Sequence, residues 1–522
     1  MQRSTAPRSA LWLSLAATAL AGCTTVGPDF HAPAAPTVAG YTRQSLPAST
    51  ASAPGAAGGP QEVAAATVPA NWWTRFGSDK LDSLIAQALQ NNPSLAAAQA
   101  SLRQARQTYA AQAGSTLYPT VDAKLGASRN QSNPASFGQS SNATNTYNLY
   151  NASIAVGYNL DLFGGNRRAL EALAAQVDYQ AYQLDAARLA LAGNIATAAF
   201  TQAQLRAQID ATESILKSQQ TQLDIARKRF ALGAAARSDV LTLQTQLEQT
   251  RASLPPLRNR LEQTDHLLAA LLGQAPGAAD IPQFDLAAFT LPAKLPLVVP
   301  SELVRQRPDI QASTALLHAA TAQYGVAVSK LYPQINLSAS VGTQALTTGA
   351  LFGPGSMVWS LAGQLAQPLF NAGLKAGANA AEASLQAAGA NYRQTVLTAL
   401  RNVADALRAL DNDAQTLQAQ SAADASAQES LALVEKQYQL GAASYLQLLV
   451  AQQQAQQTRI GLLAAQAQRL ADSAALYQAM GGGAVTGAPT LAAGAAALPH
   501  EGAGPALGRP GGGAATPASA AR

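Results

Sequence analysis

Two very long stretches without proline constrain this 522-residue chain more than any other feature of its sequence. No proline occurs between Pro134 and Pro255 or between Pro368 and Pro489, and both stretches are rich in the strong helix formers Ala, Leu and Gln. Residues 166–232 alone predict one helix of roughly 100 Å, at about 1.5 Å per residue. A helix of that length has no core of its own, so it needs packing partners along its whole length, as in a coiled bundle.

The apolar positions of the first stretch favour such a bundle. A heptad-like seam has spacings of 7, 4, 10, 4, 7, 7 and 7, and it consists of Leu184, Leu191, Ile195, Leu205, Ile209, Leu216, Leu223 and Phe230. Each long helix then meets a glycine, Gly233 or Gly441, after which a second helix is predicted to return. Glycine suits a tight reversal between helices, because it adopts positive φ angles without strain.

Two strand signals precede each long helix. Apolar residues alternate with small or polar residues over residues 121–128, 150–162, 335–342 and 359–365. This period of two predicts strands with one apolar face, joined in pairs by Gly-, Ser- and Asn-rich loops at about residues 130–146 and 343–356. The pattern is typical of membrane barrels, although four strands alone are also compatible with a soluble sandwich.

The same plan occurs twice along the chain. Paired landmarks lie 207–215 residues apart: Asn92-Pro93-Ser94-Leu95 with Arg307-Pro308-Asp309-Ile310, Leu117-Tyr118-Pro119 with Leu331-Tyr332-Pro333, Leu162-Phe163-Gly164 with Leu369-Phe370-Asn371, and Phe230-Ala231-Leu232-Gly233 with Tyr438-Gln439-Leu440-Gly441. A repeat of this length indicates gene duplication and pseudo-symmetry rather than a solenoid of short units.

The repeat and the local composition divide the chain into six predicted segments. These are a signal peptide at 1–22, a lipid-anchored extended segment at 23–70, a first repeat at 71–273, a linker at 274–300, a second repeat at 301–481 and a disordered tail at 482–522. Each repeat is expected to contain a helix, two strands, a long helix and a return helix.

The N-terminus predicts export and lipidation. Arg3 and Arg8 precede a short apolar run at residues 10–20, which is typical of a signal peptide and too short for a membrane span. Leu20-Ala21-Gly22-Cys23 resembles a bacterial lipobox, which implies cleavage before Cys23 and acylation of its thiol. Thr24 follows, where an aspartate often marks inner-membrane retention, so the predicted destination is the outer membrane. The alternative is an ordinary signal peptide with an incidental cysteine.

Composition and motifs exclude several classes of function. Charged residues are 12% of the chain, the net charge is +5, and the basic residues are scattered, which predicts no nucleic-acid partner. The four histidines are isolated and the single cysteine allows no disulfide framework, so we expect no metal and no cofactor other than a covalent lipid on Cys23. No P-loop, dinucleotide fingerprint or nucleophile elbow occurs in a suitable context, so we expect no enzyme.

Specific motifs point to a known family. The duplicated plan, with Gly27-Pro28-Asp29-Phe30, Asn71-Trp72-Trp73, Arg307-Pro308-Asp309-Ile310 and Tyr332-Pro333, resembles the TolC/OprM family of outer-membrane ducts, in its NodT-like lipoprotein branch. The resemblance implies a mainly α fold with a membrane β-barrel. Three chains would form one 12-stranded barrel, four strands per chain, continued by a 12-helix periplasmic α-barrel.

The resemblance also implies a function. Such a homotrimer is the passive exit duct of a tripartite efflux pump, gated at its periplasmic tip and opened by a periplasmic adaptor protein and an inner-membrane RND transporter. Two other readings are the exit duct of a type I protein secretion system and a structural envelope lipoprotein. The alternating strands argue against the structural lipoprotein, because a coiled-coil linker needs no barrel.

In this family the two helical turns form the tip that docks the adaptor and closes the tunnel. The resemblance places the docking surface at Leu232, Gly233, Leu440 and Gly441, and the gate at Ser238, Asp239, Tyr438, Leu446 and Val450. Ser238 could instead only cap the return helix. Tyr438 matches a family tyrosine that hydrogen-bonds to the neighbouring hairpin.

The chain departs from its family inside the mouth of the tunnel. Family members often carry a ring of aspartates in the second return helix, whereas this chain has Ala443, Leu446, Gln447 and Val450 there. Leu446 and Val450 lie four residues apart on one helix face, so they are predicted to form an apolar ring in the trimer. The alternative is that both pack against other helices.

Overall fold

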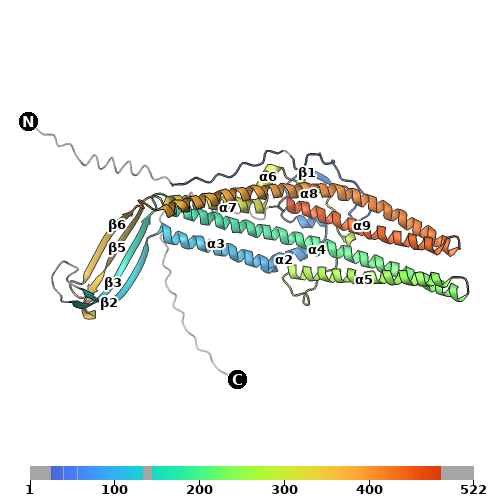
Figure 1. The fold of residues 1–522 in the computed structure, drawn as a ribbon, viewed down its shortest axis with the longest axis horizontal. Helices are drawn as coiled ribbons and strands as arrows, with labels where there is room; N and C mark the ends of the chain where they lie inside the picture. Colours follow the sequence, from blue (N-terminus) through green and yellow to red (C-terminus); the bar gives the residue numbers. More distant parts are fainter. Residues whose placement is uncertain (1–24, 39, 56, 133–143, 484–522) are drawn as a thin grey trace, which may run out of the picture.

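The computed structural model describes residues 25–38, 40–55, 57–132 and 144–483. The described chain is elongated, with a small sheet at one end and two helical hairpins at the other (Figure 1). The predicted signal peptide, Cys23, part of the first strand loop and nearly all of the predicted tail lie outside the described residues.

Long helices dominate the molecule. The α-helices are α2 (Asp79–Asn91), α3 (Pro93–Leu117), α4 (Gly165–Ala231), α5 (Arg237–Leu271), α6 (Pro300–Gln306), α7 (Pro308–Ser329), α8 (Ala372–Gln439) and α9 (Tyr445–Ala479), with short 3-10 turns η1 (Trp72–Phe76), η3 (Leu286–Ala288) and η4 (Thr348–Ala350). The two long helices, α4 and α8, contain 67 and 68 residues, which confirms the prediction from the proline-free stretches.

The seam predicted on α4 is buried over most of its length. Leu184, Leu191, Ile195 and Leu223 are among its buried residues, whereas Phe230, close to the tip, is 45% exposed. Helices α3, α5, α7 and α9 all pack against α4, so the long helix finds its partners within the chain.

Each repeat begins with more than the single helix that we predicted. The break between α2 and α3 lies at Asn92, and the break between α6 and α7 lies at Arg307. A proline follows each of these residues, and proline disfavours the helical conformation of the residue before it. Asn92 and Arg307 accordingly have ψ angles of 124°. The Asn92 side chain also accepts hydrogen bonds from the backbone N–H groups of Ser94 and Leu95, which caps α3.

Four strands form one antiparallel sheet in the order β2-β3-β5-β6, where β2 is Thr120–Ser132, β3 Asn145–Leu160, β5 Gln334–Ala345 and β6 Met357–Ala366. The register pairs Val121 with Val156, and Val341 with both Ile154 and Trp359. Residues opposite each other share a face, so the predicted alternation gives one continuous apolar face.

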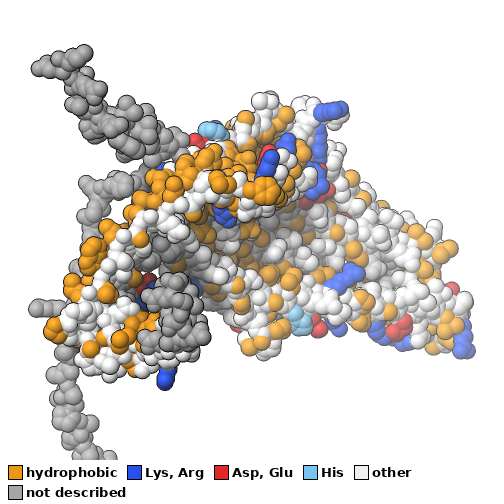
Figure 2. Space-filling view, turned by 60° about the vertical axis from the view of Figure 1, so that its left-hand side comes forward, with side chains coloured by type: hydrophobic (Ala, Val, Ile, Leu, Met, Phe, Trp, Pro, Cys, Tyr) orange, Lys and Arg blue, Asp and Glu red, His pale blue; other side chains and the backbone are white. Residues whose placement is uncertain are grey.

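The apolar face of the sheet is open to solvent in a single chain. Leu125, Trp359 and Leu361 are 85%, 73% and 76% exposed, and hydrophobic side chains gather along the sheet (Figure 2). The opposite face is polar: Asn159 donates a hydrogen bond to Asn336, and the Ser340 and Ser360 hydroxyls are 2.8 Å apart.

The main core lies midway along the helices. Trp72, Phe76, Phe200 and Tyr477 meet there, and Trp72 stacks on Tyr477 with ring centroids 5.5 Å apart. Beside this core, the parallel pair β1 (Glu62–Ala65) and β4 (Lys294–Leu297) joins the N-terminal segment to the linker between the repeats. The sequence did not lead us to expect this pair. No described helix is both long enough and apolar enough to cross a membrane.

Candidate functional site: the two hairpin tips

The tips of the α4–α5 and α8–α9 hairpins lie at the same end of the molecule (Figure 1). Gly233 and Gly441 have φ angles of +71° and +79°, which confirms that each reversal uses the left-handed conformation that favours glycine. Leu232 and Leu440, which precede them, are 83% and 84% exposed. The predicted docking residues therefore occupy the exposed end of each hairpin.

Ser238 and Asp239 lie in the first turn of α5. The Asp239 carboxylate accepts a hydrogen bond from the backbone N–H of Ala236 at 3.4 Å, and the Ser238 hydroxyl donates to Asp239 at 3.5 Å. These bonds stabilise the start of α5 itself, where a carboxylate also complements the helix dipole. Ser444 and Gln447 play the equivalent part in α9: Gln447 N–H donates to the Ser444 hydroxyl, and Ser444 N–H donates to the Gln447 amide oxygen.

Tyr438 reaches the other hairpin through an arginine that the sequence analysis missed. The guanidinium carbon of Arg229, in the last turn of α4, lies 5.4 Å from the centre of the Tyr438 ring. Such cation–π contacts are worth about 0.5–1 kcal/mol at exposed sites. A basic residue in the last turn of a helix is ordinary, so Arg229 gave no signal of this role. Within the described chain, Tyr438 therefore contacts the other hairpin through Arg229.

Tyr445 joins the hairpins more firmly. Its side chain packs against a cluster of α4 and α5 residues, Leu223, Ala226, Leu243 and Leu247. Its ring also meets the edge of Tyr438, with centroids 6.3 Å apart. The buried hydroxyl of Tyr445 has no hydrogen-bond partner among the described residues. Burial, together with nearby Tyr438 and Asp239, raises the pKa of Tyr445 to about 12, so the group stays neutral at physiological pH.

Amide pairs continue the contact behind Tyr445. The Gln452 side chain of α9 donates to Gln222 of α4 at 2.6 Å, and Gln453 donates to Gln246 of α5 at 3.2 Å. These pairs carry no net charge. The helical periodicity of the sequence does not indicate which glutamine contacts which, so none of these four residues was predicted.

Leu446 and Val450 point away from the packing within the chain. They are 67% and 57% exposed, whereas Leu448 between them is 1% exposed. Their shared exposed face remains compatible with the predicted apolar ring and with packing against another copy of the chain.

The chain matches known proteins over both of its repeats. The family model described as "Outer membrane efflux protein" matches residues 84–274 and 299–482. The chain belongs to this outer-membrane efflux family. Its function is accordingly that of an outer-membrane channel of efflux pumps, and it is not an enzyme, as the sequence predicted.

Individual relatives span nearly the whole chain. The "Antibiotic efflux pump outer membrane protein ArpC" of Pseudomonas putida is 32% identical over 90% of this chain and 95% of its own length. "Nodulation protein T" of Rhizobium leguminosarum bv. viciae is 30% identical over 79% of this chain and 84% of its own. The solved outer-membrane channel OprN superimposes with a TM-score of 0.79 at 27% identity, over 88% of this chain and 99% of that one.

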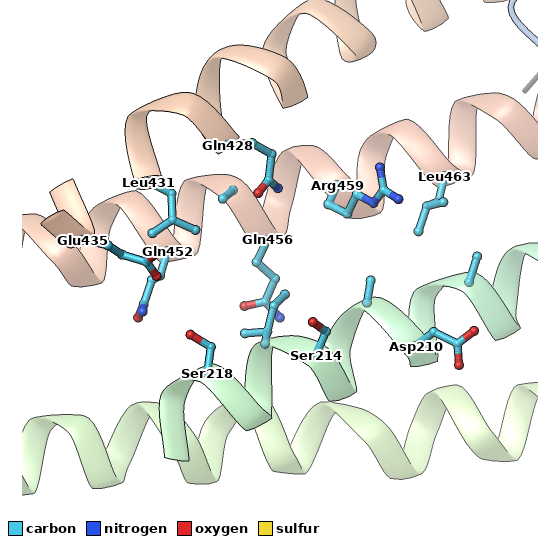
Figure 3. Close-up of a pocket in the computed structure, with 14 residues that line it drawn as sticks. Asp210, Ser214, Ser218, Gln428, Leu431, Glu435, Gln452, Gln456, Arg459 and Leu463 are labelled. Carbon is cyan, nitrogen blue, oxygen red and sulfur yellow. The ribbon is translucent and has the colours of Figure 1, made fainter. Parts of the chain in front are cut away.

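A groove of about 650 Å³ separates the two hairpins of the efflux channel behind their tips. In Figure 3, Asp210, Ser214 and Ser218 of α4 face the α8–α9 pair, from which Glu435 and Arg459 extend. Burial raises the pKa of Glu435 in this groove. No group of described residues has the three or more ligands that would hold a metal ion.

A buried carboxyl group, Asp472 of α9, lies farther along the helices, near Asp413 of α8. Asp472 is 8% exposed; one of its oxygens accepts a hydrogen bond from Gln468, and the other accepts none from any described donor. Burial, and then the contact with Asp413, raises the pKa of Asp472 to about 8. The Asp472 carboxyl is therefore mostly protonated at neutral pH.

This group predicts a stability that falls as the pH rises. A carboxyl whose pKa is higher in the folded state stabilises the fold below its unfolded pKa of about 3.9 and loses that effect as the pH rises to the folded value. We expect the thermal unfolding temperature to fall between about pH 4 and pH 8, and Asp472→Asn to remove part of this fall. Asp405→Asn, at a position whose side chain is 74% exposed, is the control. An unchanged pH profile in Asp472→Asn would contradict the raised pKa of Asp472.

Proposed function

We propose that three copies of this chain form one outer-membrane exit duct, with a 12-stranded barrel and a 12-helix periplasmic tunnel. The observation that carries the proposal is the open sheet: among the described residues, no strand pairs with the outer sides of its edge strands β2 and β6. In lipid each unpaired group costs several kcal/mol, so four strands with an exposed apolar face need further strands to close the sheet. The structural match to the outer-membrane channel OprN supports a channel in the outer membrane.

The tip forms the closed gate of this duct, and a periplasmic adaptor with an inner-membrane transporter of the RND type opens it. The exposed turns at Leu232–Gly233 and Leu440–Gly441 offer the docking surface, and the groove between the hairpins gives room for their movement. The names of the relatives describe efflux pump components, which favours a pump partner over a type I secretion system.

Acylation of Cys23 would anchor the mature N-terminus in the outer membrane. Mass spectrometry of the mature protein is expected to find a lipidated N-terminus at Cys23. An unmodified Cys23 inside a longer N-terminus would reject the anchor but not the duct.

The experiment that tests the gated duct is conductance in planar bilayers. We expect the wild-type channel to have a low resting conductance that divalent cations block only weakly, because Leu446 and Val450 replace the usual acidic ring and an apolar constriction closes by dewetting. Absence of any channel activity in folded protein would contradict the proposal.

Val450→Asp tests the position of the apolar ring. If Val450 lines the lumen, three introduced carboxylates attract cations, and divalent cations are expected to block the variant several-fold more strongly than wild type. Val450→Asn is the matched control, since it has a similar size and no charge. If Val450→Asp only weakens the assembly, Val450 is a packing residue.

A further inference from the structure

The described residues 25–38, 40–55 and 57–70, here called the N-terminal strap, contact the rest of the chain at several points. The Tyr41 hydroxyl donates to the carbonyl of Val298, and the Arg408 side chain donates to the carbonyl of Gln44. Nearest the N-terminus, residues 26–30 contact α4 and α7 at the base of the sheet. We call Arg168, Glu171, His318 and Gly325 the strap site.

Arg168 is the centre of the strap site. Its side chain is only 5% exposed, and it donates to the Asp29 carboxylate at 2.6 Å and to the carbonyl oxygens of Val26 and Gly27 at 3.4 Å. A further nitrogen donates to Glu171 at 2.8 Å. A buried guanidinium is costly unless it is paired and hydrogen-bonded, so this arginine depends on the strap for part of its compensation.

The second wall of the strap site comes from α7. Phe30 stacks on His318 with ring centroids 4.2 Å apart, and Nε2 of His318 lies 2.8 Å from the Glu171 carboxylate. Gly27 has a φ angle of +88°, and a Cβ atom at this position would lie 2.6 Å from the Cα of Gly325. The strap site therefore accepts a glycine there and recognises the peptide by shape as well as charge.

The contacts join the two repeats. Arg168 and Glu171 belong to the first repeat, whereas His318 and Gly325 belong to the second. The backbone N–H of Val26 also donates to the carbonyl of Phe163, whose ring stacks 4.9 Å from that of Tyr332. The peptide thus lies across the point where the strands of both repeats meet their helices.

We propose that Arg168, Glu171, His318 and Gly325 form an intramolecular binding site for the peptide Val26–Phe30, which locks the N-terminus to both repeats without help from a lipid. Cys23 lies outside the described residues, two positions before Thr25. The position of the acyl chains rests on the proposed acylation of Cys23, whereas the binding of the peptide does not.

The test separates the peptide from the lipid. The chain is exported behind a signal peptide that leaves no acylated cysteine, and a site for a sequence-specific protease is inserted between Thr37 and the exposed Val38. After cleavage of the folded protein, gel filtration in detergent measures how much of the N-terminal fragment stays bound. We expect most of it to stay bound in the parent, and at least a tenfold loss of retention in Arg168→Met. Arg167→Met, at a neighbouring side chain that is 51% exposed, is expected to behave as the parent.

A change in the peptide alone guards against misfolding of the site. Gly27→Ala places a methyl group against Gly325 and is expected to release the fragment. His31→Ala, at an exposed position of the same fragment, is expected to retain it. Release of the parent fragment, or retention in Gly27→Ala, would overturn the proposal. Bilayer conductance of the uncleaved proteins is recorded in parallel, so that a failure of the duct is recognised separately from a failure of the strap site.

Discussion

Replacing Trp72 with alanine is expected to lower the free energy of unfolding by about 3–5 kcal/mol, the usual cost of removing a buried tryptophan. Trp72 is 0% exposed, stacks on Tyr477 and meets Phe76 edge to face. It thereby joins the start of the first repeat to the last turns of α9, at the end of the second repeat. Its loss opens a cavity at this junction. Chemical denaturation followed by circular dichroism measures the effect.

The neighbouring tryptophan supplies the control for this prediction. Trp73 is only partly buried, and its alanine variant is expected to lose clearly less stability than Trp72→Ala. Equal losses in the two variants would show that the stacked cluster is not the feature that holds this region together.

Replacing Tyr445 with alanine is expected to raise the single-channel conductance several-fold. Tyr445 is the aromatic side chain of the second hairpin that packs into the Leu223–Leu247 cluster of the first hairpin. Without it, the contacts that remain near the tips are Arg229 with Tyr438 and neutral amide pairs, which are individually weak. The closed tip should then open more readily.

Tyr445→Phe separates the ring from the hydroxyl. The hydroxyl is buried without a partner among the described residues, so its removal is expected to leave the closed state intact or to favour it slightly. A phenylalanine variant as conductive as the alanine variant would mean that the hydroxyl, and not the apolar contact, keeps the tip closed.

Much of the fold could be predicted because it follows from periodic patterns. The absence of proline located α4 and α8, and the alternation of apolar residues located the strands and their apolar face. The presence of a proline was a poorer guide to where a helix ends. Asn92-Pro93 broke a helix that we expected to be continuous, whereas α5 continues through Pro255 and Pro256 despite the lost backbone donors.

The tip contacts and the strap site were harder to predict, because they depend on single residues far apart in the chain. The family resemblance located Gly233, Gly441 and Tyr438, but the partner of Tyr438 is Arg229, which looks like any basic residue at a helix end. Arg168 likewise follows Arg167 in a helix start, and only the folded chain separates the buried side chain from the exposed one.

Native mass spectrometry in detergent tests the central claim, a trimeric duct, most directly. The purified full-length protein is expected to give a single main species of three chains, because no described strand of the same chain pairs with either edge of the β2-β3-β5-β6 sheet. A stable, folded monomer that persists across concentrations and detergents would contradict the shared barrel and the tunnel built on it.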